Sequence, residues 1–176
     1  MKRIVRTGTV AALAVVLAAV GVAPANAYTT TGCDWGTIHI KVDGSYSNGA
    51  FSTALSQAIS NYYNSTVLYL TRQDSSGNSF KALNTNYGAT GWEGNTSWSC
   101  LFGTTHSAQA KLNQYYLQSA PTARLKVVWL HELGHGLGLG HVSSAYRVMY
   151  TSASTAYNNG VRSLTSDEIN GINTIY

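Results

Sequence analysis

Apolar and polar residues alternate along residues 37–43 (TIHIKVD), a pattern that predicts a half-buried strand. Apolar residues then recur at helical spacing over residues 50–62, with Ser47 or Asn48 available as the N-cap. Residues 67–70 predict a second strand, which a polar, turn-forming segment closes. Strand, helix and strand at this spacing predict a parallel pair joined by a right-handed crossover.

Strand signals continue after this unit. Residues 81–95 contain three glycines and are interpreted as a loop. Residues 98–104 and 108–116 favour two strands, which we expect to form a hairpin around His106 and Ser107.

Two helices are expected in the remainder of the chain. One follows Pro121 and runs from residue 123 to about residue 136, with an apolar side. The other begins at a T-x-x-E capping box formed by Thr165 and Glu168, and its isoleucines share one face. No internal repeat or linker interrupts these elements, so they predict a single domain.

A basic start, an apolar run and a small-residue exit site occupy residues 1–27. Three basic residues precede the apolar residues 10–23, and residues 25–27 (ANA) supply a cleavage site. We interpret residues 1–27 as a secretory signal peptide and residues 28–176 as the mature domain of a secreted, extracellular protein. A retained membrane anchor is the alternative, although the run is short for a membrane span.

Removal of the signal peptide changes the charge of the protein. Residues 28–176 carry eight Lys/Arg against seven Asp/Glu, so no basic surface indicates nucleic-acid binding. The two cysteines, Cys33 and Cys100, fit an oxidising compartment and predict a disulfide. Two unpaired buried thiols are the alternative.

Three of the five histidines lie in the stretch HELGHGLGLGH, residues 131–141. His131 and His135 are four residues apart, so on a helix both imidazoles stand on one face and can reach one metal ion. Glu132 lies beside the first histidine and can accept a proton from a water on that metal. Zinc lowers the pKa of such a water to about 7, which makes a hydroxide nucleophile available at neutral pH.

The glycine at position 138 explains how a third ligand is supplied. Glycine readily takes the left-handed conformation that ends a helix, and the chain can then return so that His141 faces the same ion. Three protein nitrogens leave one position open for water, which is typical of catalytic zinc sites and not of structural ones. The alternative is a helix with surface histidines followed by ordinary capping glycines.

The pattern H-E-x-x-H-x-x-G-x-x-H is the metzincin motif, and Met149 follows at the position of the metzincin Met-turn. Residues 128–150 resemble the catalytic domain of matrixins, the matrix metalloproteinase family, and residues 164–172 (LTSDEINGI) resemble the matrixin C-terminal helix. Small secreted bacterial metalloproteases of the snapalysin type are also similar, although they carry Asp where this chain has His141. The resemblance implies an α+β, metzincin-type zincin fold. Such a fold has a twisted, mostly parallel sheet, about three helices, and the active-site helix below an edge strand.

The resemblance also implies an activity, that of a secreted zinc endopeptidase acting on protein or peptide substrates. His131, His135 and His141 would bind one zinc ion. Glu132 would be the general base and then the acid toward the leaving amine. Met149 would form an apolar floor beneath the metal.

The implied substrate cleft follows from the way matrixins bind peptides. They hold the peptide antiparallel to an exposed edge strand by strand addition, and the best match here lies within residues 98–104. Residues 151–161 would wall the pocket for the side chain after the scissile bond. The candidate cleft residues are Trp98, Leu101, Phe102 and Tyr150.

Several features depart from the matrixin pattern. Cys33 lies outside a P-R-C-G-x-P-D motif, so thiol latency is not expected. Only His39 and His106 remain outside the cluster, so the second, structural zinc site of matrixins is not expected, and both are interpreted as surface residues. The acidic residues that could bind calcium are scattered and are interpreted as solvated surface charges: Asp43, Asp74 and Glu93. Calcium binding stays an open alternative without support in the sequence.

A rival function is a secreted binding module for surface glycans or proteins, in which zinc is structural and exposed Tyr and Trp make the contacts. A structural site has no use for a carboxylate beside a vacant ligand position, so Glu132 favours hydrolysis. Hydrolysis of non-peptide amides is a further alternative that the sequence does not separate from proteolysis. We expect a monomer.

Overall fold

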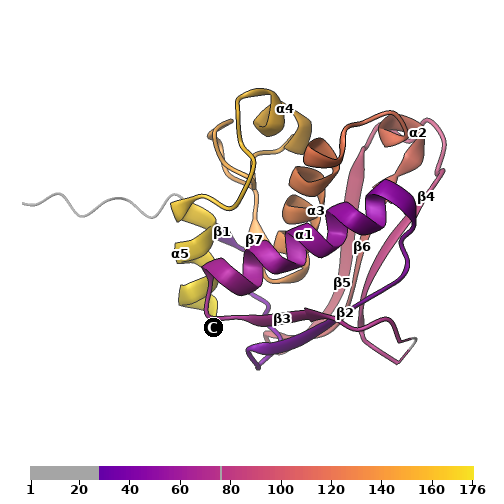
Figure 1. Ribbon diagram of the computed structural model, residues 1–176. Helices are drawn as coiled ribbons and strands as arrows, with labels where there is room; N and C mark the ends of the chain where they lie inside the picture. The colour runs from indigo at the N-terminus through magenta and orange to yellow at the C-terminus, as the bar shows by residue number, and fades with distance from the viewer. Residues whose placement is uncertain (1–27, 76) are drawn as a thin grey trace, which may run out of the picture.

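The computed structural model describes residues 28–75 and 77–176, so the predicted signal peptide lies outside the described residues. A five-stranded sheet in the order β3-β2-β4-β6-β5 forms the centre of the fold (Figure 1). Four strands run parallel and β5 is antiparallel at one edge, which confirms the predicted mostly parallel α+β architecture. The strands are β2 (His39–Tyr46), β3 (Tyr69–Arg72), β4 (Phe80–Thr85), β5 (Gly94–Leu101) and β6 (Thr104–Asn113).

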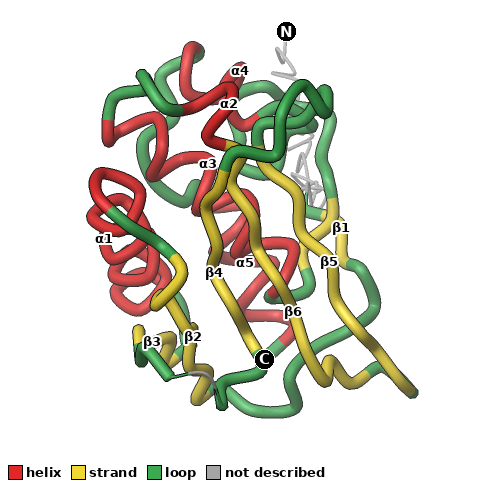
Figure 2. The backbone as a smooth tube through the Cα atoms, turned by 90° about the vertical axis from the view of Figure 1, so that its right-hand side faces the viewer, coloured by secondary structure: helices red, strands yellow, loops and turns green. Residues whose placement is uncertain are grey.

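Two long helices, α1 (Gly49–Ser65) and α3 (Thr122–Gly136), cover one face of the sheet (Figures 1 and 2). Two large buried side chains fix them against each other. The Tyr62 hydroxyl donates to the Leu130 carbonyl at 2.8 Å. The Trp129 indole N–H donates to the Phe51 carbonyl at 3.0 Å. Each aromatic ring therefore adds apolar area to the core while its polar atom is satisfied, and α3 is held in a defined position.

The prediction of a strand, a helix and a parallel second strand is confirmed, with small shifts in the boundaries. β2 pairs in parallel with β3, and α1 connects them. Asn48 is the N-cap residue of α1, but its side chain makes no capping bond. Its Oδ1 instead accepts from Asn84 Nδ2 on β4 at 3.3 Å, so this residue ties the helix start to the sheet.

The loop predicted over residues 81–95 is wrong at both ends, because β4 covers its first residues and β5 begins at Gly94. Residues Phe80–Thr85 form β4, which lies between β2 and β6 in the sheet. Phe80, Ala82 and Asn84 are buried and alternate with more exposed residues. The strand is short and one of its buried positions is an asparagine, so its alternation is hard to recognise among the following glycines.

The predicted hairpin exists, but its predicted turn is wrong. β5 and β6 pair antiparallel, and the turn falls at Phe102 and Gly103, both with positive φ (51° and 80°). His106 and Ser107 lie inside β6. Two successive left-handed residues match the right-handed twist of a two-residue hairpin, but phenylalanine is rare at such a position, so residue type did not reveal the turn.

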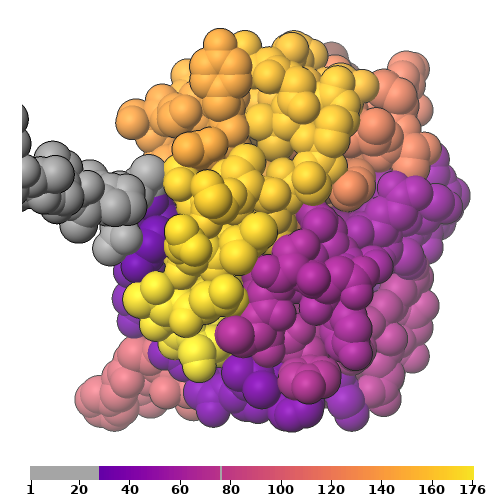
Figure 3. All heavy atoms as spheres, turned by 60° about the vertical axis from the view of Figure 1, so that its left-hand side comes forward, coloured from indigo at the N-terminus to yellow at the C-terminus, as the bar shows by residue number. Residues whose placement is uncertain are grey.

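The helix α5 (Ser166–Ile175) begins with the predicted capping box, in which both bonds between Thr165 and Glu168 are present. Two short helices, α2 (Gln114–Leu117) and α4 (Ala153–Asn158), were not predicted, so the described residues form five helices where about three were expected. Figure 3 shows the C-terminal residues (yellow) packed beside the segment that contains α1 (magenta). The Val67 N–H donates to Asn173 Oδ1 at 2.9 Å across this boundary.

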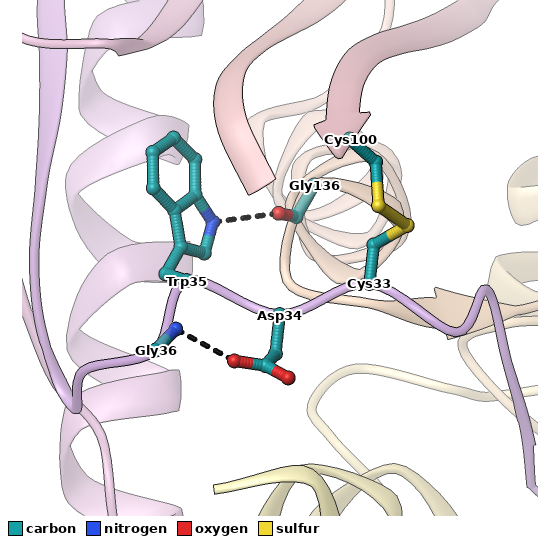
Figure 4. The surroundings of a disulfide bond; sticks show 6 residues. All are labelled: Cys33, Asp34, Trp35, Gly36, Cys100 and Gly136. Atoms are coloured by element: carbon teal, nitrogen blue, oxygen red, sulfur yellow. Dashed lines mark hydrogen bonds between the residues drawn. A yellow bond between two sulfur atoms is a disulfide. The ribbon is translucent and has the colours of Figure 1, made fainter. Parts of the chain in front are cut away.

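The N-terminal segment, residues 28–36, runs beside the end of α3. Its strand β1 (Thr29–Thr30) pairs antiparallel with β7 (Leu139–Gly140). Cys33 and Cys100 form the predicted disulfide, with a Cα–Cα distance of 6.1 Å, and this bond joins the N-terminal segment to β5 (Figure 4). No helix among the described residues is long and apolar enough to cross a membrane.

Candidate functional site

Three imidazoles converge at the C-terminal end of α3. His131 and His135 stand one turn apart on the helix, and their Nε2 atoms are 3.1 Å from each other. The Nε2 atom of His141 lies 3.0 Å from that of His135 and 3.2 Å from that of His131. Among the described residues, these three form the only group of three or more His, Cys, Asp or Glu side chains arranged to hold a metal ion.

The return of the chain to His141 depends on Gly138. This residue has φ of 99°, a conformation that favours glycine. A Cβ atom at position 138 would also overlap the carbonyl oxygen of Cys33. The backbone conformation and the close approach of the N-terminal segment therefore both require glycine here.

Side chains and backbone from distant parts of the chain hold the loop of residues 136–141 in place. Four of its carbonyls each accept a hydrogen bond: Gly136 from Trp35 Nε1 (2.9 Å, Figure 4), Leu137 from the Tyr176 hydroxyl (3.2 Å), Gly138 from the Thr31 N–H (2.8 Å) and His141 from the Thr29 hydroxyl (2.6 Å). Three of these four donors belong to the N-terminal segment. The position of His141 is thus set mainly by residues more than 100 positions earlier in the sequence.

The hydrogen bonds of the rings define their protonation. Nδ1 of His131 bonds to the Val148 carbonyl at 2.8 Å, and Nδ1 of His135 bonds to the Leu139 carbonyl at 2.9 Å. A carbonyl oxygen only accepts, so each Nδ1 carries the proton and each Nε2 presents a lone pair. Burial lowers the pKa of His131 to about 3 and that of His135 to about 4, so both rings are neutral near pH 7.

This arrangement fits a metal cation. Lone pairs of neutral nitrogens about 3 Å apart repel one another unless a positive charge lies between them. Imidazole nitrogens oriented through carbonyl bonds on their far side are a typical zinc donor set. The residues present therefore match the requirements of a zinc ion.

Glu132 lies in a buried position beside the histidines. Thr96 on β5 donates its hydroxyl to Glu132 Oε2 at 2.7 Å. Gly94, at the start of the same strand, leaves space for the carboxylate, because a Cβ atom there would overlap it. Burial raises the pKa of Glu132 to about 8, and the Thr96 bond opposes this rise. A cation bound at the three histidines would also lower the pKa of Glu132, because it favours the charged carboxylate.

Met149 is fully buried beneath α3. Its sulfur lies against the helix backbone at Gly134, where a Cβ atom would overlap it. The Met149 N–H donates to Glu168 Oε1 at 3.2 Å, and its carbonyl accepts from the Val142 N–H at 2.9 Å. Because the neighbouring Val148 carbonyl orients His131, this turn supports the site through the backbone as well as through packing.

Two hollows flank Glu132 along the edge strand. The first has a volume of about 480 Å³ and is bounded by residues 91–94, the start of α3 and residues 151–154. The second has a volume of about 520 Å³ and follows β5 from Gly94 to Trp98 past His135 and His141. An extended peptide beside β5 would therefore cross the site between two open regions.

Of the four predicted cleft residues, only Trp98 lines one of the two hollows. Trp98 lines the second hollow and is 40% exposed. Leu101 and Phe102 lie at the tip of the β5–β6 hairpin, and Phe102 is 97% exposed; neither lines the two hollows. Tyr150 packs against the core, and the next residue, Thr151, borders both hollows instead.

Five residues outside the histidine cluster were interpreted as surface residues, and three of them are exposed in the structure. His39 and His106 are exposed, and His39 stacks on Tyr69 with ring centroids 4.7 Å apart. Asp74 is a surface residue, paired with Arg72. Asp43 is not a solvated charge: it is fully buried, because β2 continues past the predicted strand end, and its Oδ1 accepts from the Ser45 N–H and hydroxyl.

Glu93 is also wrongly interpreted as a solvated charge. Its carboxylate forms an ion pair with Arg124 at 3.1 Å and accepts hydrogen bonds from the N–H and hydroxyl of Ser154. Its side chain is only 20% exposed. Sequence reasoning missed this network and the contacts of Gly94 and Thr96 with Glu132, because no local pattern indicates contacts between residues more than 30 positions apart.

Comparison with known proteins gives consistent results. A family model described as Matrixin matches residues 25–176. A protein of Spodoptera frugiperda ascovirus 1a, named "Putative matrix metalloproteinase", is 44% identical over 63 residues. The match covers 35% of this chain and 16% of the viral protein, so this chain corresponds to a small part of that relative.

Proposed function

The chain belongs to the matrixin family of zinc metalloendopeptidases, and on this basis we propose that it hydrolyses peptide bonds in extracellular proteins. His131, His135 and His141 hold the zinc ion in this proposal, and Glu132 is the general base. The observation that carries it is the set of three imidazole Nε2 atoms within 3.2 Å of one another, beside a buried carboxylate. A purely structural zinc site gives no reason for that carboxylate.

The edge strand β5 supplies the substrate platform. A peptide that adds to β5 in antiparallel orientation forms main-chain hydrogen bonds with the strand, which bind any sequence. Its scissile carbonyl then lies near Thr96 and Glu132, since the Thr96 hydroxyl donates to the Glu132 carboxylate. The residues after the scissile bond extend toward Gly94 and the first hollow, and those before it extend toward Trp98.

Glu132 moves the proton in the reaction. When bound, zinc supplies Lewis acidity that makes water nucleophilic near neutral pH. Glu132 accepts a proton from the attacking water and then donates it to the leaving amine. The Thr96 bond and the space at Gly94 keep the carboxylate in one orientation through both transfers. Burial excludes bulk water, which would compete for the proton.

Secretion is part of the proposal. The basic, apolar and small-residue pattern of residues 1–27 and the disulfide between Cys33 and Cys100 both support an oxidising, extracellular location. Detection of a protein that begins at residue 28 in the culture medium of the producing cell would support it. Retention of the full chain in the membrane fraction would contradict it.

The Glu132→Gln variant tests the mechanism. It keeps the size of the side chain but cannot accept a proton, so we expect zinc content to stay at one ion per chain while kcat/KM falls at least about 100-fold. The measurement is cleavage of a proteome-derived peptide library, followed by mass spectrometry. Matched controls are a His106→Ala variant, which alters an exposed histidine, and wild-type protein treated with a zinc chelator. Wild-type rates in Glu132→Gln would contradict the mechanism.

A further inference from the structure

The first hollow is lined by both aromatic and polar residues. It opens beside His131 and Glu132, and its sides are formed partly by the aromatic residues Trp92 and Tyr116. Residues of three separate segments close it with polar groups: Glu93 before β5, Arg124 on α3 and Ser154 on α4. A side chain that enters this hollow can therefore contact both aromatic rings and hydrogen-bonding groups.

The polar groups are fixed by one another. Arg124 Nη2 lies 3.1 Å from Glu93 Oε2, and Arg124 Nε donates to the Ser154 hydroxyl at 2.6 Å. The Ser154 N–H donates to Glu93 Oε1 at 2.8 Å, and the Ser154 hydroxyl donates to Glu93 Oε2. This network occupies most of the acceptor positions of the Glu93 carboxylate. The Glu93 carboxylate thus has few acceptor positions left for a ligand.

Two groups that line the hollow can donate hydrogen bonds to a ligand. Neither N–H of Arg124 Nη1 has a partner among the described residues, and the Tyr116 hydroxyl accepts from the Gly91 N–H at 2.9 Å, so its own proton is available. Arg124 lines the hollow, and its side chain is 32% exposed. The wall can therefore bind an acceptor oxygen.

The charge of the wall favours a neutral acceptor. The positive charge of Arg124 is balanced by Glu93 at 3.1 Å. A carboxylate in the hollow would gain little net attraction and would lie close to Glu93. An amide oxygen can accept the same hydrogen bonds without repulsion from the Glu93 charge.

We propose that the Glu93–Arg124–Ser154 network makes this hollow selective for a glutamine side chain at the substrate position that follows the scissile bond. Glutamine has a long, unbranched side chain and carries a neutral acceptor at its end. The assignment to that position rests on the proposed endopeptidase function, because it requires a peptide antiparallel to β5. Residues 91–94 place the hollow at the end of β5 that the C-terminal part of such a peptide reaches.

Methionine is the matched comparison for glutamine, because both side chains are unbranched and of similar length. A hydrogen bond to a charged donor is sufficient for at least about tenfold discrimination. We expect wild-type kcat/KM to be at least about tenfold higher for a peptide with glutamine after the scissile bond than for its methionine counterpart. Glutamate and leucine peptides should also be cleaved less efficiently than the glutamine peptide.

The Arg124→Met variant should remove this preference, so that the glutamine-to-methionine ratio falls to about one or below. Lys126→Met is the matched control: it removes the same charge two residues further along α3, but Lys126 borders a separate hollow beside α1, and the ratio should not change. Because Arg124→Met leaves Glu93 without its ion pair, a second variant, Arg124→Met with Glu93→Gln, guards against loss of folding. It should show the same loss of preference.

A binding measurement separates this inference from the catalytic proposal. In the Glu132→Gln background, the glutamine peptide should bind at least about tenfold more tightly than the methionine peptide, as measured by fluorescence anisotropy, and Arg124→Met should abolish the difference. If no peptide is cleaved, the proposed function fails, while the binding ratio still decides the role of the hollow. Equal cleavage or binding of the two peptides, or a preference that persists without Arg124, would overturn the inference.

Discussion

Loss of the Cys33–Cys100 disulfide should weaken zinc binding as well as the fold. The bond closes a loop with a sequence separation of 67 residues, so its removal frees the unfolded chain and should lower the free energy of unfolding by about 4 kcal/mol. The same bond fixes the N-terminal segment, which supplies three of the four hydrogen bonds that hold the loop of residues 136–141. A freed segment should release His141.

The perturbation is the double variant Cys33→Ser with Cys100→Ser. Loss of the contacts that orient a metal ligand typically lowers metal affinity by about 10- to 100-fold, and we expect a decrease in this range. Zinc affinity is measured by competition with a chromogenic chelator. Stability is measured by urea denaturation of the zinc-free protein, because bound zinc would itself raise the apparent stability.

A control separates loss of stability from loss of the metal site. Leu55→Ala removes a fully buried side chain from α1 and should cost about 2–5 kcal/mol of stability. Within the described residues, no hydrogen bond joins α1 to residues 136–141. Its zinc affinity should remain that of the wild type. If the double serine variant binds zinc as tightly as Leu55→Ala does, the N-terminal segment does not position His141, and the reasoning is refuted.

Two glycine substitutions give further predictions. Gly138→Ala should lower the free energy of unfolding by about 2 kcal/mol or more and reduce zinc affinity, since φ is 99° and a Cβ atom would overlap the Cys33 carbonyl. Gly160→Ala is the control, because its φ of 91° is similar but its surroundings are open, and it should cost only about 1 kcal/mol. Urea denaturation of both variants measures the difference. Gly94→Ala should displace the Glu132 carboxylate and lower kcat/KM at least about 100-fold with zinc retained, and an unchanged rate would argue against a fixed carboxylate.

The three histidines proposed to bind zinc were predictable from the sequence because the helical spacing of two of them and the glycine turn before the third are local, although the N-terminal segment fixes the final position of His141. His131 and His135 share a helix face, and Gly138 turns the chain so that His141 can return. Helical spacing and glycine conformation are properties of neighbouring residues, and a sequence displays them directly. The same holds for the capping box of α5 and for the apolar face of α1.

The parts that were missed depend on contacts between distant residues. β4 became a strand through pairing with β2 and β6 on both sides, although its own alternation is short. Glu93 is drawn into a network by Arg124 and Ser154, which lie 31 and 61 positions away. A single carboxylate looks the same in a sequence whether it faces water or an arginine, so its partners become known only when the fold is known.

The position of the turn between β5 and β6 was predicted wrongly for a different reason. Sequence rules place asparagine or glycine at left-handed positions, whereas here phenylalanine occupies one at Phe102. The pairing of β5 with β6 is extensive enough to hold that conformation in spite of its cost. Local preference was overruled by the strands on either side.

The two oxygens of Glu168 are divided between two tasks. Oε2 accepts from the N–H and hydroxyl of Thr165 at the start of α5, and Oε1 accepts from the N–H of Met149. The first turn of the last helix therefore cannot fray without also loosening the turn that orients His131. Deletion of this helix would therefore remove a hydrogen bond from the turn whose Val148 carbonyl orients His131, and we expect it to disturb the proposed metal site.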